Sequence, residues 1–271
     1  MNFKKSYKPQ NGYTHICRIG ECSLKDLEFG IIELTPGQKL EFDTKDKETA
    51  FVVLWGTCAF IADGKDYGKV GMRATVFASP KAECFYAGRN TRIEMTSVHN
   101  CRIAVCATPI DADTEPQAIR QADVRVARLG VKPWERDTSF IVDGSTNARK
   151  LTIGEAYCCP GNWAGFPPHK HDVDNMPREC VAEEIYYFLF DPPQGFGIQC
   201  LYTDDGEIDE AYRVRSDDLV EFPYGYHTTV GAPGYNTYFL WLMAGEQQGF
   251  CRMNDPDHAW VAAVENIVRK M

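Results

Sequence analysis

Short apolar runs separated by Gly, Pro and Asp dominate the hydrophobic pattern of this chain. Turn formers bound the runs, as in Asp63-Gly64 and Asp204-Asp205-Gly206. The clearest predicted strands are 51–55, 58–62, 102–106, 185–190, 197–203, 208–214, 219–222 and 238–243. Many short strands at regular spacing, with few helical patterns, predict an all-β fold built from β-sandwich or jelly-roll barrels.

One segment departs from this pattern. Residues 257–270 place apolar side chains at helical spacing. The apolar residues near one face of this predicted helix are Trp260, Val261, Val264, Ile267 and Val268. We therefore expect a short C-terminal helix that packs on a barrel or on a neighbouring subunit.

A weak internal repeat divides the chain into two halves. The segment 35–56 has Glu48 ahead of an apolar run, and its counterpart 166–190 has Glu184 ahead of another. This repetition predicts a duplicated barrel. The predicted parts are an N-terminal barrel at 1–110, a connector at 111–150, and a C-terminal barrel with the helix at 151–271.

Composition narrows the classes of function. The 271 residues include 29 Lys and Arg against 38 Asp and Glu, so the net charge is −9. This charge repels polyphosphate and excludes nucleic acid as the leading partner. No apolar stretch reaches the roughly 18 residues that a membrane span needs. The basic N-terminus runs into polar residues rather than a signal-peptide core, and the 11 cysteines form no C-x-x-C pair. We therefore expect a cytoplasmic protein with reduced thiols.

The sharpest chemical signal is the sequence His169-Lys170-His171. Residues i and i+2 of a strand point to the same side, so the two imidazoles project into one space. Glu184 opens an apolar strand downstream, and His227 follows a Pro-x-Gly turn. Three imidazoles and one carboxylate suit a zinc, manganese, iron or nickel ion and leave coordination positions open for a substrate. We predict one divalent ion per chain, with zinc preferred.

The order of these residues resembles the metal site of the cupin superfamily, and the two halves resemble a bicupin. A denser similarity connects residues 150–260 with the 5-deoxy-glucuronate isomerase family of bacterial myo-inositol catabolism. The segments that carry this similarity are 161–163, 167–172, 174–177, 183–187, 194–196, 202–205, 225–227 and 243–245.

The resemblance implies a metal-dependent aldose–ketose isomerase that converts 5-deoxy-D-glucuronate to 5-dehydro-2-deoxy-D-gluconate. Its partners would be a small sugar-acid substrate and further copies of the chain in a homo-oligomer, with no nucleic acid and no membrane. Three alternatives share the fold: a ketol-isomerase for a pectin-derived hexuronate, a bicupin dioxygenase with redox-active iron, and a non-catalytic sugar-binding bicupin. The complete ligand set of the second half favours an enzyme.

The carboxylate ligand departs from the generic cupin pattern. Twelve residues separate His171 from Glu184, whereas generic cupins place the glutamate only a few residues after the second histidine. Asp172, Glu179 and Glu183 therefore stay open as substitutes for Glu184.

The isomerisation requires an electrophile on the carbonyl oxygen and a base near the carbon. The sequence does not choose between acid–base candidates. We name Glu183, Tyr226 and Asp174, with a metal-bound water as a further candidate. For the substrate we name Arg178, in the insertion ahead of Glu184, and Tyr187. Further cations for the substrate carboxylate are Arg213 and Arg149, whereas Lys170 is discounted because it points opposite to its two histidine neighbours on a regular strand.

The first half lacks the histidine pattern. Glu41, Asp43 and Glu48 stand at the corresponding positions. Such a set is most typical of a solvated strand face, although three carboxylates can also hold a hard cation. We expect the first barrel to be structural or to form an oligomer interface.

Overall fold

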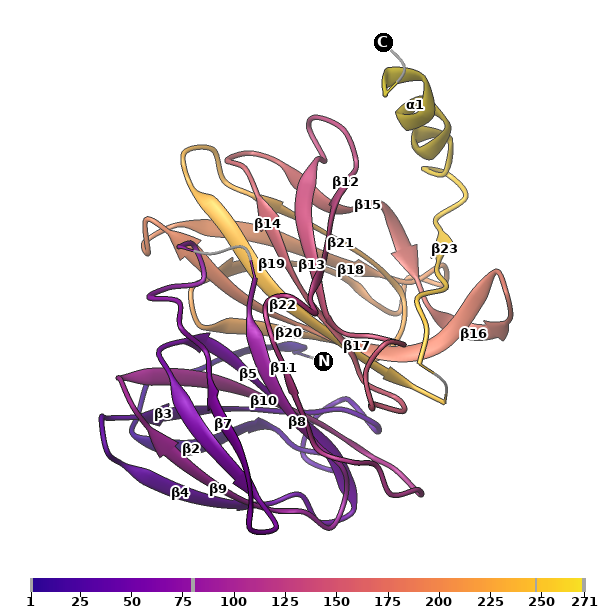
Figure 1. Cartoon of the computed structure of the whole chain (residues 1–271). Helices are drawn as coiled ribbons and strands as arrows, with labels where there is room; N and C mark the ends of the chain where they lie inside the picture. Colours follow the sequence, from indigo (N-terminus) through magenta and orange to yellow (C-terminus); the bar gives the residue numbers. More distant parts are fainter. Residues whose placement is uncertain (1, 79–80, 247, 270–271) are drawn as a thin grey trace.

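The computed structural model describes residues 2–78, 81–246 and 248–269, and it consists of two antiparallel β-sandwiches (Figure 1). In the first sandwich, a six-stranded sheet of order β11-β8-β5-β10-β3-β2 faces a four-stranded sheet of order β4-β9-β6-β7. The larger sheet comprises β2 (Gly12–Cys17), β3 (Glu28–Leu34), β5 (Lys47–Trp55), β8 (Glu83–Ala87), β10 (Cys101–Pro109) and β11 (Gln117–Ile119). The smaller sheet comprises β4 (Lys39–Asp43), β6 (Cys58–Ala62), β7 (Lys65–Val70) and β9 (Arg92–Ser97).

The second sandwich has larger sheets. An eight-stranded sheet of order β1-β20-β17-β22-β14-β13-β12, with β16 paired to β17, faces a five-stranded sheet of order β19-β18-β21-β15-β23. The first of these comprises β1 (Lys4–Ser6), β12 (Arg125–Leu129), β13 (Arg136–Val142), β14 (Thr152–Cys158), β16 (Asp172–Asn175), β17 (Glu179–Asp191), β20 (Asp218–Phe222) and β22 (Asn236–Gly245). The second comprises β15 (Trp163–Lys170), β18 (Phe196–Tyr202), β19 (Asp209–Arg215), β21 (Tyr226–Gly231) and β23 (Met253–Asn254).

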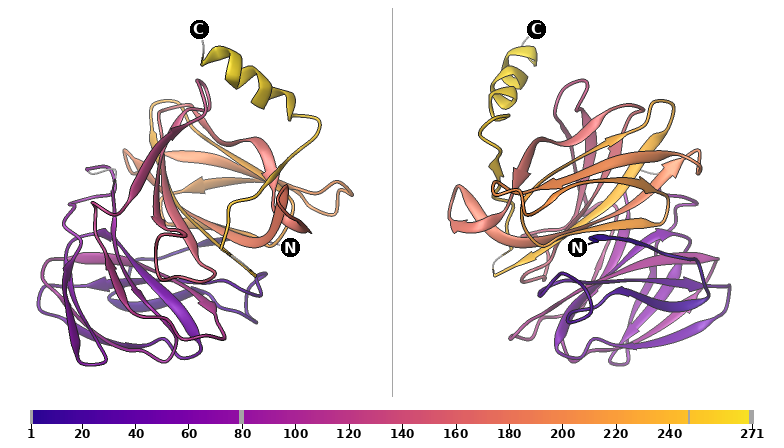
Figure 2. Two further views of the ribbon diagram at one scale, coloured as in Figure 1. Left: turned by 45° about the vertical axis from the view of Figure 1, so that its right-hand side comes forward. Right: turned by 180° about the vertical axis from the view of Figure 1, so that it is seen from behind.

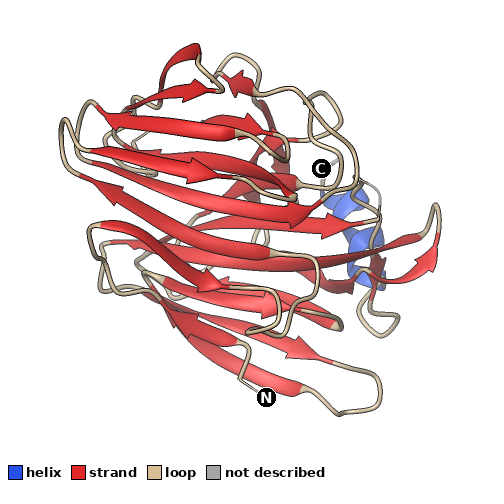
Figure 3. Ribbon diagram, turned by 90° about the horizontal axis from the view of Figure 1, so that it is seen from below, coloured by secondary structure: helices blue, strands red, loops and turns tan. Residues whose placement is uncertain are grey.

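The view in Figure 3 shows strands throughout both halves and one short helix, α1 (Trp260–Val268). The all-β prediction and the predicted C-terminal helix are therefore confirmed. Each predicted strand lies within an observed one or overlaps it, and the predicted turn at 204–206 joins the paired strands β18 and β19.

The large sheets of the two sandwiches pack against each other through a shared hydrophobic core. From the first sandwich this core takes Ile31, Val52 and Leu54, and from the second it takes Ile185 and Leu240, among other fully buried side chains. Each large aliphatic side chain buried there contributes about 1.5–3 kcal/mol. The two halves are therefore held together by a continuous core.

Buried polar contacts also cross between the sandwiches. Arg73 follows β7, and its guanidinium contacts the carboxylate of Glu155 on β14 at 2.5 Å and 3.1 Å. The hydroxyl of Tyr238 donates to the same carboxylate at 2.7 Å. Arg102 on β10 bridges Glu33 of its own sandwich and Asp217 of the other, each at 2.5 Å.

Chain segments from outside 151–271 enter the second sandwich. The strand β1 pairs with the edge strand β20, and β12 and β13 extend the same sheet beyond β14. By contrast, β11 pairs with β8 of the first sandwich. The predicted connector 111–150 thus supplies strands to both sandwiches, because an unpaired sheet edge is stabilised by an added strand. As limits of independently folding domains, the predicted bounds stay a prediction.

The three acidic residues of the first half do not converge. Glu41 pairs with Arg92 on an exposed face at 2.8 Å, and Asp43 accepts the backbone N–H of Lys45. Glu48 is fully buried. Its carboxylate accepts the backbone N–H groups of residues 149, 150 and 151, each at 2.8 Å. Glu48 therefore fastens the connector to the first sandwich.

The helix α1 lies beside the second sandwich and away from the first (Figure 2). The indole of Trp134 donates to Glu265 at 3.2 Å, and Val261 is buried. Trp260 and Ile267 are more than 60% exposed, so part of the apolar face meets no other described segment. Within the described residues, no helix has the length and apolar character needed to cross a membrane.

We expect Arg73→Met to lower the free energy of unfolding by about 3–5 kcal/mol, because the Glu155 carboxylate then stays buried without its cation. Glu155→Leu should lower the free energy of unfolding by a similar amount. The double variant Arg73→Met/Glu155→Leu should recover most of the loss, since it buries no unpaired charge. Urea unfolding of the four proteins measures this coupling. Additive losses in the double variant would show that the pair is not coupled.

Candidate metal centre

The predicted metal ligands converge inside the second sandwich. His169 lies on β15, His171 lies between β15 and β16, Glu184 lies on β17 and His227 lies on β21. The Nε2 atoms of His171 and His227 each lie 3.0 Å from Oε2 of Glu184. The ring centroid of His169 is 4.5 Å from that of His227 and 6.3 Å from that of His171. All four side chains are buried.

A backbone carbonyl fixes the orientation and tautomer of each imidazole. In every case Nδ1 donates to a carbonyl oxygen, so Nε2 carries the lone pair that can bind a metal. The three contacts are His169 to the carbonyl of Gly165 at 3.1 Å, His171 to that of Ala182 at 2.7 Å, and His227 to that of Gly225 at 3.3 Å.

The donor atoms fit a divalent cation. One donor atom each from His171, Glu184 and His227 lies within 4.8 Å of the other two. The buried Nε2 atom of His227 has no hydrogen-bond partner among the described residues, although Oε2 of Glu184 is close. A lone pair and a carboxylate oxygen at this distance repel each other unless a cation lies between them. Imidazole nitrogen and carboxylate oxygen are donors that zinc and other transition metals accept.

The electrostatics of the cluster favour the protonation states that a metal requires. Burial opposes ionisation of Glu184, but the imidazoles of His171 and His227 outweigh it and hold the carboxyl pKa below its usual value. Burial lowers the pKa of His227. Burial, followed by the charge of Arg252, lowers the pKa of His169 well below its usual range. The site therefore presents an ionised carboxylate at Glu184 and neutral imidazoles at His169 and His227 at neutral pH.

His171 differs from the other two histidines. Burial lowers its pKa, but the hydrogen bond with Glu184 outweighs burial and raises the pKa above its usual value. In the absence of metal, His171 is therefore the imidazole that shares a proton with the carboxylate.

Gly165 makes room for His169. Its φ of +60° lies in the left-handed region, and a Cβ there would lie 3.2 Å from Cε1 of His169. The absence of a side chain lets the imidazole lie against the backbone whose carbonyl it binds. No sequence motif marks this glycine, because its role depends on the irregular backbone of β15 between Ala164 and His169.

The alternative carboxylates lie outside the cluster. The Glu179 carboxylate accepts hydrogen bonds from the ammonium of Lys170 and from the backbone N–H of Asp172, both at 3.0 Å. Asp172 itself pairs with Lys170 and accepts the N–H of Gly225. Among the three carboxylates left open and Glu184, the structure brings only Glu184 to the imidazoles.

Glu183 and Tyr187 point to the other face of β17, towards the first sandwich. The Glu183 carboxylate accepts the backbone N–H groups of Lys25 and Asp26 at 2.8 Å. The Tyr187 hydroxyl donates to Asp217 and accepts from Arg102. The geometry does not support the predicted role of Glu183 in catalysis or of Tyr187 in substrate binding. Side chains of a strand alternate between its two faces. Glu183 and Tyr187 lie one and three positions from Glu184, so they face the opposite side.

The remaining predicted residues lie at the periphery of the site. The Tyr226 ring packs on Tyr202 with centroids 5.5 Å apart, beside Lys170. Asp174 and Arg178 are exposed, on β16 and just after it. The structure does not bring these residues into contact with the imidazoles, and their catalytic or binding roles stay predictions.

A narrow cavity of about 30 Å³ adjoins the cluster, enough for an ion and one or two waters. His169, Glu184 and Tyr186 are among the residues that line it. Arg136, at the start of β13, and Arg252, in the segment after β22, line it as well. No local sequence motif distinguishes these two arginines, because only the folding of distant segments brings them to the cavity.

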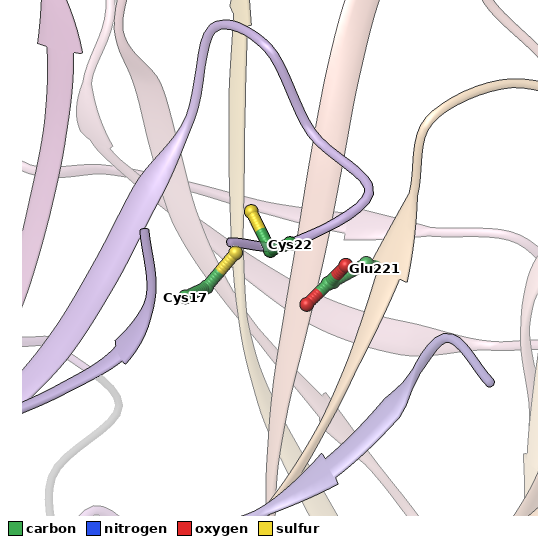
Figure 4. A group of neighbouring side chains, drawn as sticks. All are labelled: Cys17, Cys22 and Glu221. Atoms are coloured by element: carbon green, nitrogen blue, oxygen red, sulfur yellow. The ribbon is translucent and has the colours of Figure 1, made fainter. Parts of the chain in front are cut away.

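A second group of metal-binding residue types consists of Cys17, Cys22 and Glu221 (Figure 4). Here the carboxylate already has a cationic partner: Glu221 contacts the ammonium of Lys5 at 2.7 Å, and it accepts the N–H of Ser23 at 2.9 Å. Burial raises the pKa of Cys17, which keeps it a thiol. These contacts join the loop after β2 to β20, and we assign no metal to them.

Sequence comparison relates the chain to known isomerases over its full length. The model of the KduI/IolB family matches residues 3–261. The 5-deoxy-glucuronate isomerase of Bacillus velezensis is 36% identical over 249 residues, 91% of this chain and 92% of that protein. The 5-deoxy-glucuronate isomerase of Bacillus subtilis strain 168 is 33% identical over 95% of this chain and 96% of that protein.

Solved structures give the same relation at the level of the fold. An IolB-like protein from Salmonella typhimurium LT2 superposes with a TM-score of 0.92 at 28% identity, covering 97% of this chain and all of the other. An oxalate decarboxylase from Lactobacillus farciminis, at 10% identity and a TM-score of 0.69 over 97% of this chain and 90% of the other, shares the bicupin fold alone. The predicted bicupin architecture and family resemblance are confirmed, and this chain belongs to the KduI/IolB family.

Proposed function

We propose that this protein is a metal-dependent aldose–ketose isomerase that converts 5-deoxy-D-glucuronate to 5-dehydro-2-deoxy-D-gluconate. The observation that carries the proposal is the buried group of His171, Glu184 and His227, with its imidazole tautomers already set for a metal. Full-length relatives named 5-deoxy-glucuronate isomerase support the choice of substrate. The cytoplasmic location and the homo-oligomeric state stay predictions.

His171, Glu184 and His227 would hold the ion, with His169 as a fourth ligand, and zinc remains our preferred metal. A bound divalent ion supplies a Lewis acid that polarises a carbonyl oxygen and stabilises an enediolate without redox chemistry.

The residues around this group prepare the cavity for a polar substrate. Burial raises the pKa of Tyr186 well above its usual value, so its phenol stays protonated and can donate a hydrogen bond to a substrate oxygen. Phe239 and Trp241 form an apolar wall beside it and exclude water. A sugar acid is larger than the cavity, so its entry requires movement of lining side chains such as the exposed Phe250.

We expect the purified protein to isomerise 5-deoxy-D-glucuronate under anaerobic conditions when loaded with zinc or manganese. Glu184→Gln should lower kcat by roughly 100-fold or more, because it removes the charged ligand of the proposed ion. A coupled assay for the ketose product measures this, with a hexuronate as the competing substrate. A strict requirement for oxygen, or faster turnover of the hexuronate, would contradict the proposal.

We expect about one equivalent of metal per chain in the wild type, since the site offers one set of ligands. His171→Ala, His227→Ala and Glu184→Gln should each lose at least about tenfold in metal content, because each removes a donor. His99→Ala, which alters an exposed histidine, is the matched control. Mass spectrometry of the purified proteins gives the metal content. Full metal content in the ligand variants would place the ion elsewhere.

Metal retention should fall as the pH falls. Protons compete with metal for the imidazoles, and the raised pKa of His171 makes this competition begin at a higher pH than for an ordinary histidine. We expect full retention at about pH 8 and progressive loss between about pH 7 and pH 5. Dialysis across this range, followed by metal analysis and return to pH 8 with added zinc, tests the prediction. Retention that does not change across the range would argue against imidazole ligands.

A further inference from the structure

Arg136 and Arg252 bring two positive charges to the cavity beside the proposed metal site. Arg136 is only 8% exposed and lies on β13, and Arg252 lies in the segment between β22 and β23. One guanidinium nitrogen of Arg252 is 3.5 Å from Nε2 of His169. Both side chains line the cavity together with Glu184 and Tyr186.

Neither guanidinium has a carboxylate within ion-pair distance among the described residues. The guanidinium of Arg136 donates a long hydrogen bond, at 3.4 Å, to the carbonyl of Trp134. Arg252 lies over the ring of Phe250 at 5.7 Å from its centroid. The buried arginines Arg73 and Arg102 differ in this respect, since Arg73 pairs with Glu155 and Arg102 with Glu33 and Asp217.

The two charges also oppose each other. Both guanidinium groups line one small cavity, so their like charges repel each other. Burial lowers the pKa of Arg136. Two such cations without a carboxylate at contact distance are costly, and the pair is stabilised when an anion binds to both.

We infer that Arg136 and Arg252 form the subsite that binds the carboxylate of a sugar-acid substrate. A guanidinium binds a carboxylate through two parallel N–H donors, and burial strengthens this contact. The subsite lies next to His169 and Glu184, so it would hold the acid end of the substrate while the carbonyl end reaches the proposed ion. Arg178, the sequence-based candidate, is exposed in the turn between β16 and β17 and does not line this cavity.

This inference rests on the proposed function for the identity of the substrate, but its test does not require turnover. D-Gluconate and D-glucitol are open-chain polyols of the same length that differ at one terminus, a carboxylate in the first and an alcohol in the second. Neither has a carbonyl group to isomerise. The ratio of their affinities therefore reports the carboxylate contact alone.

We expect the metal-loaded wild type to bind D-gluconate more tightly than D-glucitol in calorimetric titrations. Arg136→Met should weaken D-gluconate binding roughly 10- to 150-fold and leave D-glucitol binding unchanged, because it removes a charged hydrogen-bond donor. Arg136→Lys should retain part of the preference, since it keeps the charge without the bidentate geometry. Arg252→Met should resemble Arg136→Met.

Two controls separate this effect from damage to the fold or to the metal site. Arg128→Gln, on the neighbouring strand β12, alters an exposed arginine that pairs with Asp137 and should keep the full preference. Metal content and thermal unfolding of Arg136→Met should match the wild type, or its stability should rise, because an unpaired buried charge is removed.

An unchanged gluconate-to-glucitol ratio in Arg136→Met would overturn the subsite, as would a wild type that does not discriminate between the probes. If the wild type prefers D-gluconate and the variants lose this preference, the subsite stands even when no isomerase activity is found. If the wild type isomerises the sugar acid and Arg136→Met keeps both its KM and the probe ratio, the proposed function stands and the subsite fails.

Discussion

Successive side chains of β17 point alternately into two different environments. Because of this alternation, the packing of the two sandwiches on each other also positions the residues of the proposed metal site. Ile185, Tyr187 and Leu189 face the first sandwich and join the core shared by the two large sheets. Tyr186 and Phe188, between them in the sequence, face the interior of the second sandwich. If β17 shifted by one residue, the side chains in the shared core and those in the second sandwich would exchange places. The packing of the shared core therefore also keeps Glu184 in its position.

The two acidic residues at the start of this strand show the consequence. Glu183 and Glu184 are adjacent and chemically identical, yet one binds backbone N–H groups of the first sandwich and the other meets two imidazoles. The first sandwich therefore contributes to the site without supplying a ligand. It buries the outer face of β17 and keeps the inner face directed at the cavity.

Charge compensation distinguishes the buried groups that stabilise the fold from those that could bind a ligand. Where the sandwiches meet, Arg73 and Arg102 each have carboxylate partners, and Glu48 is satisfied by backbone N–H groups. In the cavity the compensation is incomplete. The Nε2 atom of His227 has no hydrogen-bond partner among the described residues, and Arg136 and Arg252 have no carboxylate at contact distance. A cation and an anionic ligand would complete it, which is the pairing that a metal-dependent sugar-acid isomerase requires.

The sequence by itself determined the strand pattern, the duplicated architecture, and the grouping of His171, Glu184 and His227. These features are encoded locally, in the two-residue period of strands, in turn dipeptides and in short sequence motifs. Only the tertiary structure decided that Glu183 and Tyr187 belong to the contact between the sandwiches, because the sequence does not show which side of β17 each barrel covers. Only the tertiary structure brought Arg136 and Arg252 to the cavity, since charge compensation depends on the distance between segments far apart in the chain.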